Sequence, residues 1–222
     1  MSEQVGAART FLCAASCMAS ALAPSVHKLL RAASAAADSG PRFRCQVFGP
    51  EWNAFVEAWA PRIYAFLTEA LGRYQTEPLP VILPISDGFH AAGANASFNP
   101  YDGQVCLSTY MEGAPGVTLE KLTHEFMHAS LAHFPEGDPF TEEGWVDYSV
   151  FVLAHAPLWG EHRASMIQAA ADNIRIRRDR AFKTQTDYDR KRWAGGVYAS
   201  QAYGPHIITR LRQKKAAGDL TW

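Results

Sequence analysis

Short apolar runs in the first half of the chain predict strands, and one longer run with helical spacing lies among them. Alternation over residues 42–49 and a continuous apolar run at 79–85 predict two strands. Between them, apolar side chains recur at helical spacing and predict a helix over 52–71. Segments 94–98 and 104–108 flank the sequence NPYDG, so together they predict a hairpin with a five-residue connection.

The second half of the chain has the pattern of consecutive helices. Thr118 is in position to cap a helix that ends near Pro135, and Thr141 is in position to cap another that ends before Pro157. A longer helix is expected over 161–180 and a last one around 204–215. Strands followed by a run of helices predict an α+β fold.

Composition limits both the size of the protein and its partners. The 222 residues, 48% of them hydrophobic and 19% charged, suffice for one domain with a buried core, which we expect to span 24–222. A formal net charge of −1 argues against a nucleic acid as partner, and the basic cluster RIRRDR at 175–180 is expected to be a solvated helix face. The sequence has no run of 18 or more apolar residues, so no transmembrane segment is predicted.

Residues 1–23 have some features of a cleavable signal peptide, namely an arginine, a run of small and apolar residues, and the sequences ASA and ALA. Glu3, and a run rich in alanine and serine rather than leucine, fit a disordered arm instead. The first set of features favours a secreted or periplasmic protein, with a cytoplasmic one as the alternative. In an oxidising compartment Cys45 and Cys106 would be able to form a disulfide, and two buried free thiols are the equal alternative.

The stretch THEFMHASLAHF, residues 123–134, contains the pattern His-Glu-x-x-His. His124 and His128 lie four residues apart, so on a helix their imidazoles project from one face and can converge on one metal ion. Glu125 falls about 100° round the helix from His124, near enough to hold a metal-bound water without being a ligand. The alternative interpretation is a capped amphipathic helix with two incidental histidines.

A catalytic zinc site needs a third protein ligand and an open position for water. The metzincin extension of the motif is absent, because Leu131 and Phe134 stand where glycine and histidine would be needed. Glu143 begins the next predicted helix, and the seven-residue connection before that helix is long enough for it to fold back to the metal. Four residues on, Asp147 is placed to accept the second ring N–H of a ligand histidine. Glu142 is the rival ligand, or else a first-turn carboxylate near the helix dipole.

This motif, followed by Glu-Gly at the start of a second helix and an acid four positions on, resembles the gluzincin branch of zinc peptidases. Together with the preceding strand and hairpin, it is similar to small peptidase MA-like domains over about residues 43–155, with 156–222 as a helical C-terminal part. The resemblance implies a zincin-like fold with a small mixed sheet, the Zn²⁺ ligands His124, His128 and Glu143, the general base Glu125, and Asp147 as partner of a ligand histidine. The short spacer before Glu143 and the lack of an exopeptidase motif leave exopeptidase specificity unsupported.

The resemblance also implies the reaction, which is hydrolysis of a peptide or protein substrate by a zinc-bound water that gives its proton to Glu125. A downstream tyrosine or histidine would stabilise the oxyanion, and Tyr203 is preferred over Tyr198 and His206. By the same analogy, strand 104–108 would offer an exposed edge to an extended substrate. The alternative from another functional class is an inactive zincin-like binding or scaffolding module that retains structural zinc.

Overall fold

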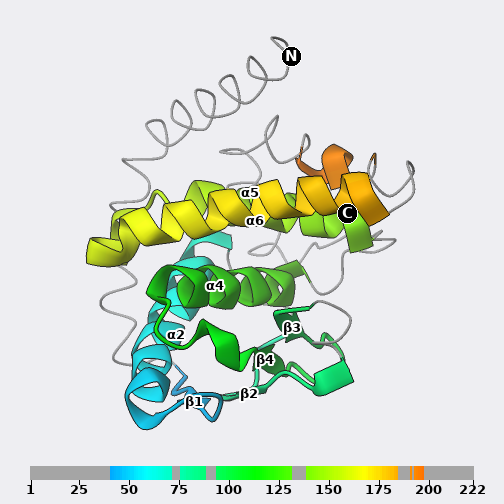
Figure 1. Cartoon of the computed structure of the whole chain (residues 1–222). Helices are drawn as coiled ribbons and strands as arrows, with labels where there is room; N and C mark the ends of the chain where they lie inside the picture. The colour runs from blue at the N-terminus through cyan, green and yellow to red at the C-terminus, as the bar shows by residue number, and fades with distance from the viewer. Residues whose placement is uncertain are drawn as a thin grey trace.

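The chain forms a small mixed sheet that carries layers of helices, as the computed structural model shows (Figure 1). The structure describes residues 41–71, 76–88, 94–131, 139–184, 191 and 193–197. Within these ranges most residues are helical and one sheet has four strands. The α+β prediction is therefore confirmed.

The strand order of the sheet is β1-β2-β4-β3. Strand β2 (Val81–Pro84) lies parallel to β1 (Arg44–Cys45) and to β4 (Val105–Leu107). Strand β3 (Ala96–Phe98) is antiparallel to β4, which confirms the hairpin prediction. Because β4 has a partner on each side, the expectation of an exposed edge at 104–108 is wrong, and β3 is the outer strand of that side among the described residues.

Strand β1 is shorter than the predicted 42–49 because a side chain ends the extended conformation. The Asn53 carboxamide oxygen accepts the backbone N–H groups of Val47 and Phe48, and its nitrogen donates to the Phe48 carbonyl at 2.7 Å. These bonds close a turn that leads directly into helix α2 (Pro50–Leu71). The alternation of residue types continues to Val47, but the last backbone hydrogen bond to β2 is the one from the Gln46 N–H to the Ile82 carbonyl, at 3.0 Å.

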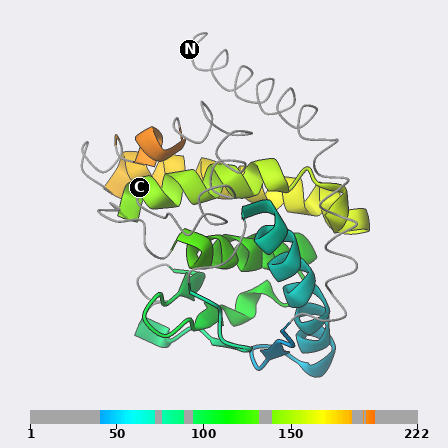
Figure 2. The same ribbon diagram turned by 180° about the vertical axis from the view of Figure 1, so that it is seen from behind.

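Helix α4 (Pro115–Leu131) occupies the middle of the molecule. It lies between the sheet on one side and helices α5 (Pro139–Leu153) and α6 (Arg163–Thr184) on the other (Figure 1). Helix α2 packs against α4 and runs across the direction of the other three helices, as the opposite view shows (Figure 2). Apolar side chains of α4, including Leu119, Leu122 and Phe126, are fully buried. The His-Glu-x-x-His segment thus lies on the most enclosed helix of the described fold.

The two motif helices begin earlier than their predicted threonine caps. Helix α4 starts at Pro115 and α5 starts at Pro139, since proline is preorganised for the first helical position and has no N–H that needs a partner there. Thr118 lies inside α4, where its hydroxyl donates to the carbonyls of Met111 and Ala114. The prediction of caps at Thr118 and Thr141 is therefore wrong, although both helices exist.

The helical second half also differs in its boundaries. Helix α5 ends at Leu153, and a 3-10 segment, η2 (Pro157–His162), separates it from α6. Helix α6 begins two residues later and ends four residues later than the predicted 161–180. The helix expected around 204–215 lies outside the described residues. None of the described helices combines the length and apolar character that a membrane span needs.

Cys45 and Cys106 are free thiols. They lie on β1 and β4 with β2 between them, so two strand spacings of about 4.8 Å separate them, beyond the reach of a disulfide. Cys45 is buried, and this burial raises the pKa of its thiol to about 11. The structure therefore has two free thiols, but only Cys45 is buried, since Cys106 is partly exposed.

Candidate metal centre

His124 and His128 lie one turn apart on α4 and point toward each other. Their Nε2 atoms are 3.0 Å apart, and the ring centroids are 4.8 Å apart. The side chains are 2% and 14% exposed, respectively, so both rings are shielded from bulk water. The i, i+4 spacing in the sequence has become a pair of convergent imidazoles.

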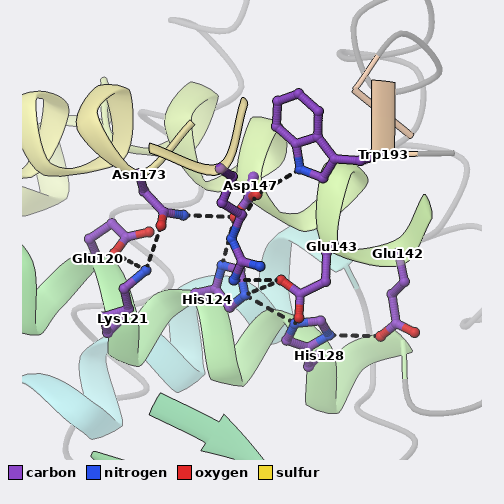
Figure 3. Close-up of polar contacts among 10 residues, drawn as sticks. Glu120, Lys121, His124, His128, Glu142, Glu143, Asp147, Asn173 and Trp193 are labelled. Carbon is purple, nitrogen blue, oxygen red and sulfur yellow. Dashed lines mark hydrogen bonds and ion pairs between the residues drawn. The ribbon is translucent and has the colours of Figure 1, made fainter. Parts of the chain in front are cut away.

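Helix α5 brings Glu143 to the same point. Its Oε2 lies 3.3 Å from His124 Nε2, and its Oε1 lies 3.5 Å from His128 Nε2 (Figure 3). The potential ligand atoms of these three residues all lie within 4.8 Å of one another. Among the described residues this is the one group of three or more side chains suited to hold a metal ion. The structure thus brings together the three predicted ligands, whose role as ligands stays a prediction.

Each imidazole has a second carboxylate at its other nitrogen. Asp147 Oδ1 lies 3.3 Å from His124 Nδ1, and Glu142 Oε1 lies 2.7 Å from His128 Nδ1 (Figure 3). Asp147 is where the spacing predicted it. Glu142, which sequence reasoning weighed as a rival ligand, instead contacts the side of the His128 ring that faces away from the convergent nitrogens.

The arrangement of these nitrogens fits a bound cation. An ionised carboxylate only accepts hydrogen bonds, so a neutral His128 ring, whose Nδ1 is hydrogen-bonded to Glu142, carries its proton on Nδ1. His124 Nδ1 makes no hydrogen bond, but the negative Asp147 carboxylate 3.3 Å away favours the proton on that nitrogen too. The two Nε2 atoms then carry lone pairs that face each other beside the Glu143 carboxylate. Such a convergence is repulsive unless a proton or a metal ion lies among the three groups. Their separations of 3.0–3.5 Å are close to the edge, about 3.3 Å, of a tetrahedron built on zinc–nitrogen bonds.

Charge around the site is unbalanced in the direction that favours a cation. Five carboxylates and two cationic side chains make up the cluster within the described part of the chain, a net charge of −3 with both histidines neutral. These side chains are Glu120, Lys121, Glu125, Glu142, Glu143, Asp147 and Arg177. A divalent ion would offset most of this charge, and ligand carboxylates gain most from such an ion where water is excluded.

Titration of the convergent groups follows from their neighbours. Burial alone would raise the pKa of Glu143, but Arg177 and the two histidines hold it well below its usual range. Burial would lower the pKa of His128, but Glu142 and Glu143 raise it well above its usual value. Without a metal ion, these neighbours favour a proton on the His128 ring.

Glu125 is a buried carboxylate next to this group. Its side chain comes from the middle of α4, and the residue is only 5% exposed. Burial raises its pKa, while the nearby rings of His124 and His128 act in the opposite direction. A carboxylate in such surroundings is poised to take up a proton, as the predicted general base must.

Helix α6 contributes residues that sequence reasoning missed. Asn173 donates to Asp147 Oδ1 at 2.7 Å and accepts from Lys121 Nζ at 2.9 Å. Arg177 lies one turn further along, with its Nη2 2.8 Å from Glu143 Oε2 and its Nε 3.2 Å from Asp147 Oδ2. The expectation that 175–180 is only a solvated face is therefore wrong for Arg177. The spacing could have predicted that these two side chains act together, since Asn173 and Arg177 are four residues apart and share one face of the helix.

A short helix over 193–197 completes the surroundings of Asp147. The Trp193 indole N–H donates to Asp147 Oδ2 at 3.1 Å (Figure 3). Two glycines permit this contact: a Cβ on Gly144 would lie 2.2 Å from the Trp193 carbonyl oxygen, and one on Gly196 would lie 2.0 Å from the Thr141 carbonyl oxygen. The glycine of the Glu-Gly pair therefore allows close helix packing, which holds the indole against the buried carboxylate.

Substitution by alanine should have opposite effects on stability at the two adjacent glycines of this helix, Gly195 and Gly196. Gly196→Ala is expected to lower the free energy of unfolding by about 1–3 kcal/mol because its Cβ meets α5 backbone that has no room to move. Gly195→Ala is the matched control: nothing lies within 4 Å of its Cβ, and alanine favours a helix, so stability should rise by up to about 1 kcal/mol. Thermal melts of both variants check this, and equal shifts would contradict the packing described here.

The remaining predicted site residues are not placed by the structure. Tyr198, Tyr203 and His206, the candidates for the oxyanion donor, lie outside the described residues. Comparison of the chain with protein-family models, with curated proteins and with solved structures finds no match. The functional argument therefore rests on the geometry of the site itself.

Proposed function

We propose that this protein is a zinc-dependent hydrolase of peptide bonds with a gluzincin-type site. The observation that carries the proposal is the convergence of three lone-pair-bearing groups, His124 Nε2, His128 Nε2 and the Glu143 carboxylate, in a net negative environment. The choice of zinc follows from the donor set, because two imidazoles and one carboxylate leave an open position in a tetrahedral catalytic site. The choice of peptides follows from the resemblance of the motif pair to gluzincins.

In this proposal His124, His128 and Glu143 would hold the ion. A zinc ion held there would act as a Lewis acid, which would lower the pKa of a bound water and polarise a carbonyl group. Glu125 accepts the proton of the attacking water at a carboxylate oxygen and passes it to the leaving amine. The Asp147 carboxylate, 3.3 Å from His124 Nδ1, favours a proton on that nitrogen by its charge and so leaves Nε2 to the metal. Asn173, Arg177 and Trp193 hold Asp147 in turn. Tyr203 stays the preferred oxyanion donor.

The decisive experiment is the zinc content of the wild type beside Glu143→Ala, both purified without chelator. We expect about one zinc ion per wild-type chain and a large loss in the variant, because two imidazoles alone make an incomplete site. Glu161→Ala, which removes an 87% exposed carboxylate, is the control and should keep its zinc. A wild type without zinc would contradict the proposal. A wild type that contains zinc but hydrolyses no peptide in a mixture would favour the alternative, an inactive binding or scaffolding module with structural zinc.

A further inference from the structure

The contact between Glu142 and His128 has no part in the ligand set described above. His128 Nδ1 lies 2.7 Å from Glu142 Oε1, the shortest ion-pair distance in this cluster. The two side chains are only 14% and 21% exposed, so little water competes for the contact. A charge-assisted bond of this length, shielded from solvent, fixes the plane and the tautomer of the ring.

Geometry excludes Glu142 from the convergent ligand atoms. Nδ1 and Nε2 lie on different sides of the imidazole, and Glu142 contacts the first while Glu143 approaches the second at 3.5 Å. The group of ligand atoms within 4.8 Å of one another accordingly contains His124, His128 and Glu143, and Glu142 is not a member. Position in the first turn of α5 accounts for a favourable interaction of Glu142 with the helix dipole, but not for its short contact with the ring.

The structure assigns Glu142 the role of a positioning residue, which holds the His128 imidazole with its Nε2 toward the metal. This inference rests on the proposed zinc site. Helix α5 would then supply one ligand, Glu143, and a separate carboxylate for each histidine, Glu142 for His128 and Asp147 for His124. An acceptor at Nδ1 fixes the orientation and the tautomer of the ring, so loss of such a partner weakens metal binding.

The two possible roles of Glu142, positioning residue and metal ligand, predict different effects of a glutamine at this position. A positioning residue only needs to accept the Nδ1–H, which the amide oxygen of glutamine also does, whereas a metal ligand needs the carboxylate charge. Glu142→Gln is therefore expected to bind Zn²⁺ nearly as tightly as the wild type, and Glu142→Ala about 10–100-fold more weakly. Glu143→Gln, the matched change one residue on, is expected to lose far more affinity than either.

Competition with a chromogenic chelator measures these affinities, and the visible spectrum of the Co²⁺ forms reports the ligand set. Under the assigned role, Glu142→Ala keeps the wild-type Co²⁺ spectrum at saturating metal while its affinity falls. Equal losses in Glu142→Ala and Glu142→Gln, with an altered spectrum, would make Glu142 a ligand and overturn the assignment. Wild-type affinity in Glu142→Ala would also overturn the assignment, but it would not contradict the zinc site. A wild type that binds neither Zn²⁺ nor Co²⁺ would contradict both the assignment and the zinc site.

Discussion

Replacement of Glu125 by glutamine is expected to abolish most hydrolysis while the protein keeps its zinc. Glutamine has the size of glutamate but does not accept a proton from water, so the rate should fall by about 10²–10⁴-fold. The fold should tolerate the change, because Glu125 is buried and burial raises the pKa of its carboxyl. A carboxylate with a raised pKa costs stability above its unfolded-state pKa, so the neutral amide should leave the protein at least as stable at neutral pH.

The measurement is turnover of a peptide mixture at equal zinc content, with the melting temperature recorded for each protein. Glu161→Gln, on the exposed face of η2, is the control for a lost carboxylate and should match the wild type in rate. Unchanged hydrolysis in Glu125→Gln would mean that another group takes the proton. Loss of zinc together with activity would instead show that Glu125 is needed to assemble the site.

Features encoded by local spacing could be predicted from the sequence. His124 and His128 share a helix face because four residues make about one turn, and Glu143 and Asp147 do so for the same reason. The hairpin followed from two apolar segments around a turn sequence. In each case, the residues that determine the geometry lie within a few positions of one another in the chain.

Features that depend on packing between distant segments could not be predicted in the same way. Arg177 lies in a basic run whose local pattern fits a solvated face, yet α6 packs against α4 and α5 and brings its guanidinium to Glu143. Trp193 reaches Asp147 only because Gly144 and Gly196 let two helices approach closely. No periodicity in the sequence specifies which helices meet or at what distance.

Competition between local sequence signals explains why the starts of α4 and α5 were predicted at the wrong residues. Thr118 and Thr141 are good capping residues, but Pro115 and Pro139 precede them and suit the first helical position without loss of a hydrogen bond. Once α4 began at Pro115, the Thr118 hydroxyl was free to bond backward to Met111 and Ala114. The Glu142 contact was missed for a related reason, since a first-turn carboxylate already has an explanation in the helix dipole.

Asp147→Asn is expected to be among the most destabilising conservative substitutions in the described chain. The side chain of Asp147 is fully buried, and its Oδ2 accepts from the Trp193 indole at 3.1 Å and lies 3.2 Å from Arg177 Nε. Its Oδ1 accepts from the Asn173 amide, so both carboxylate oxygens face donors, and an asparagine leaves a donor facing its NH₂ group whichever way it turns. The substitution also removes the charge that pairs with Arg177. Breaking a buried pair costs about 3–5 kcal/mol. Because the Arg177 side chain is 36% exposed and can regain water, we expect about 3 kcal/mol.

Urea denaturation of metal-free protein isolates this effect from zinc binding. Asp172→Asn is the matched control on α6, because its side chain is 40% exposed and its bonds to Gln168 and Arg175 lie at the surface. That control should change stability by no more than about 0.5 kcal/mol. If both variants unfold at the wild-type urea concentration, the network around Asp147 does not stabilise the fold. The buried charge of Asp147 would then serve only its interaction with His124. A large loss confined to Asp147→Asn would show that the carboxylate beside His124, one of the proposed metal ligands, also holds α4, α5 and α6 together.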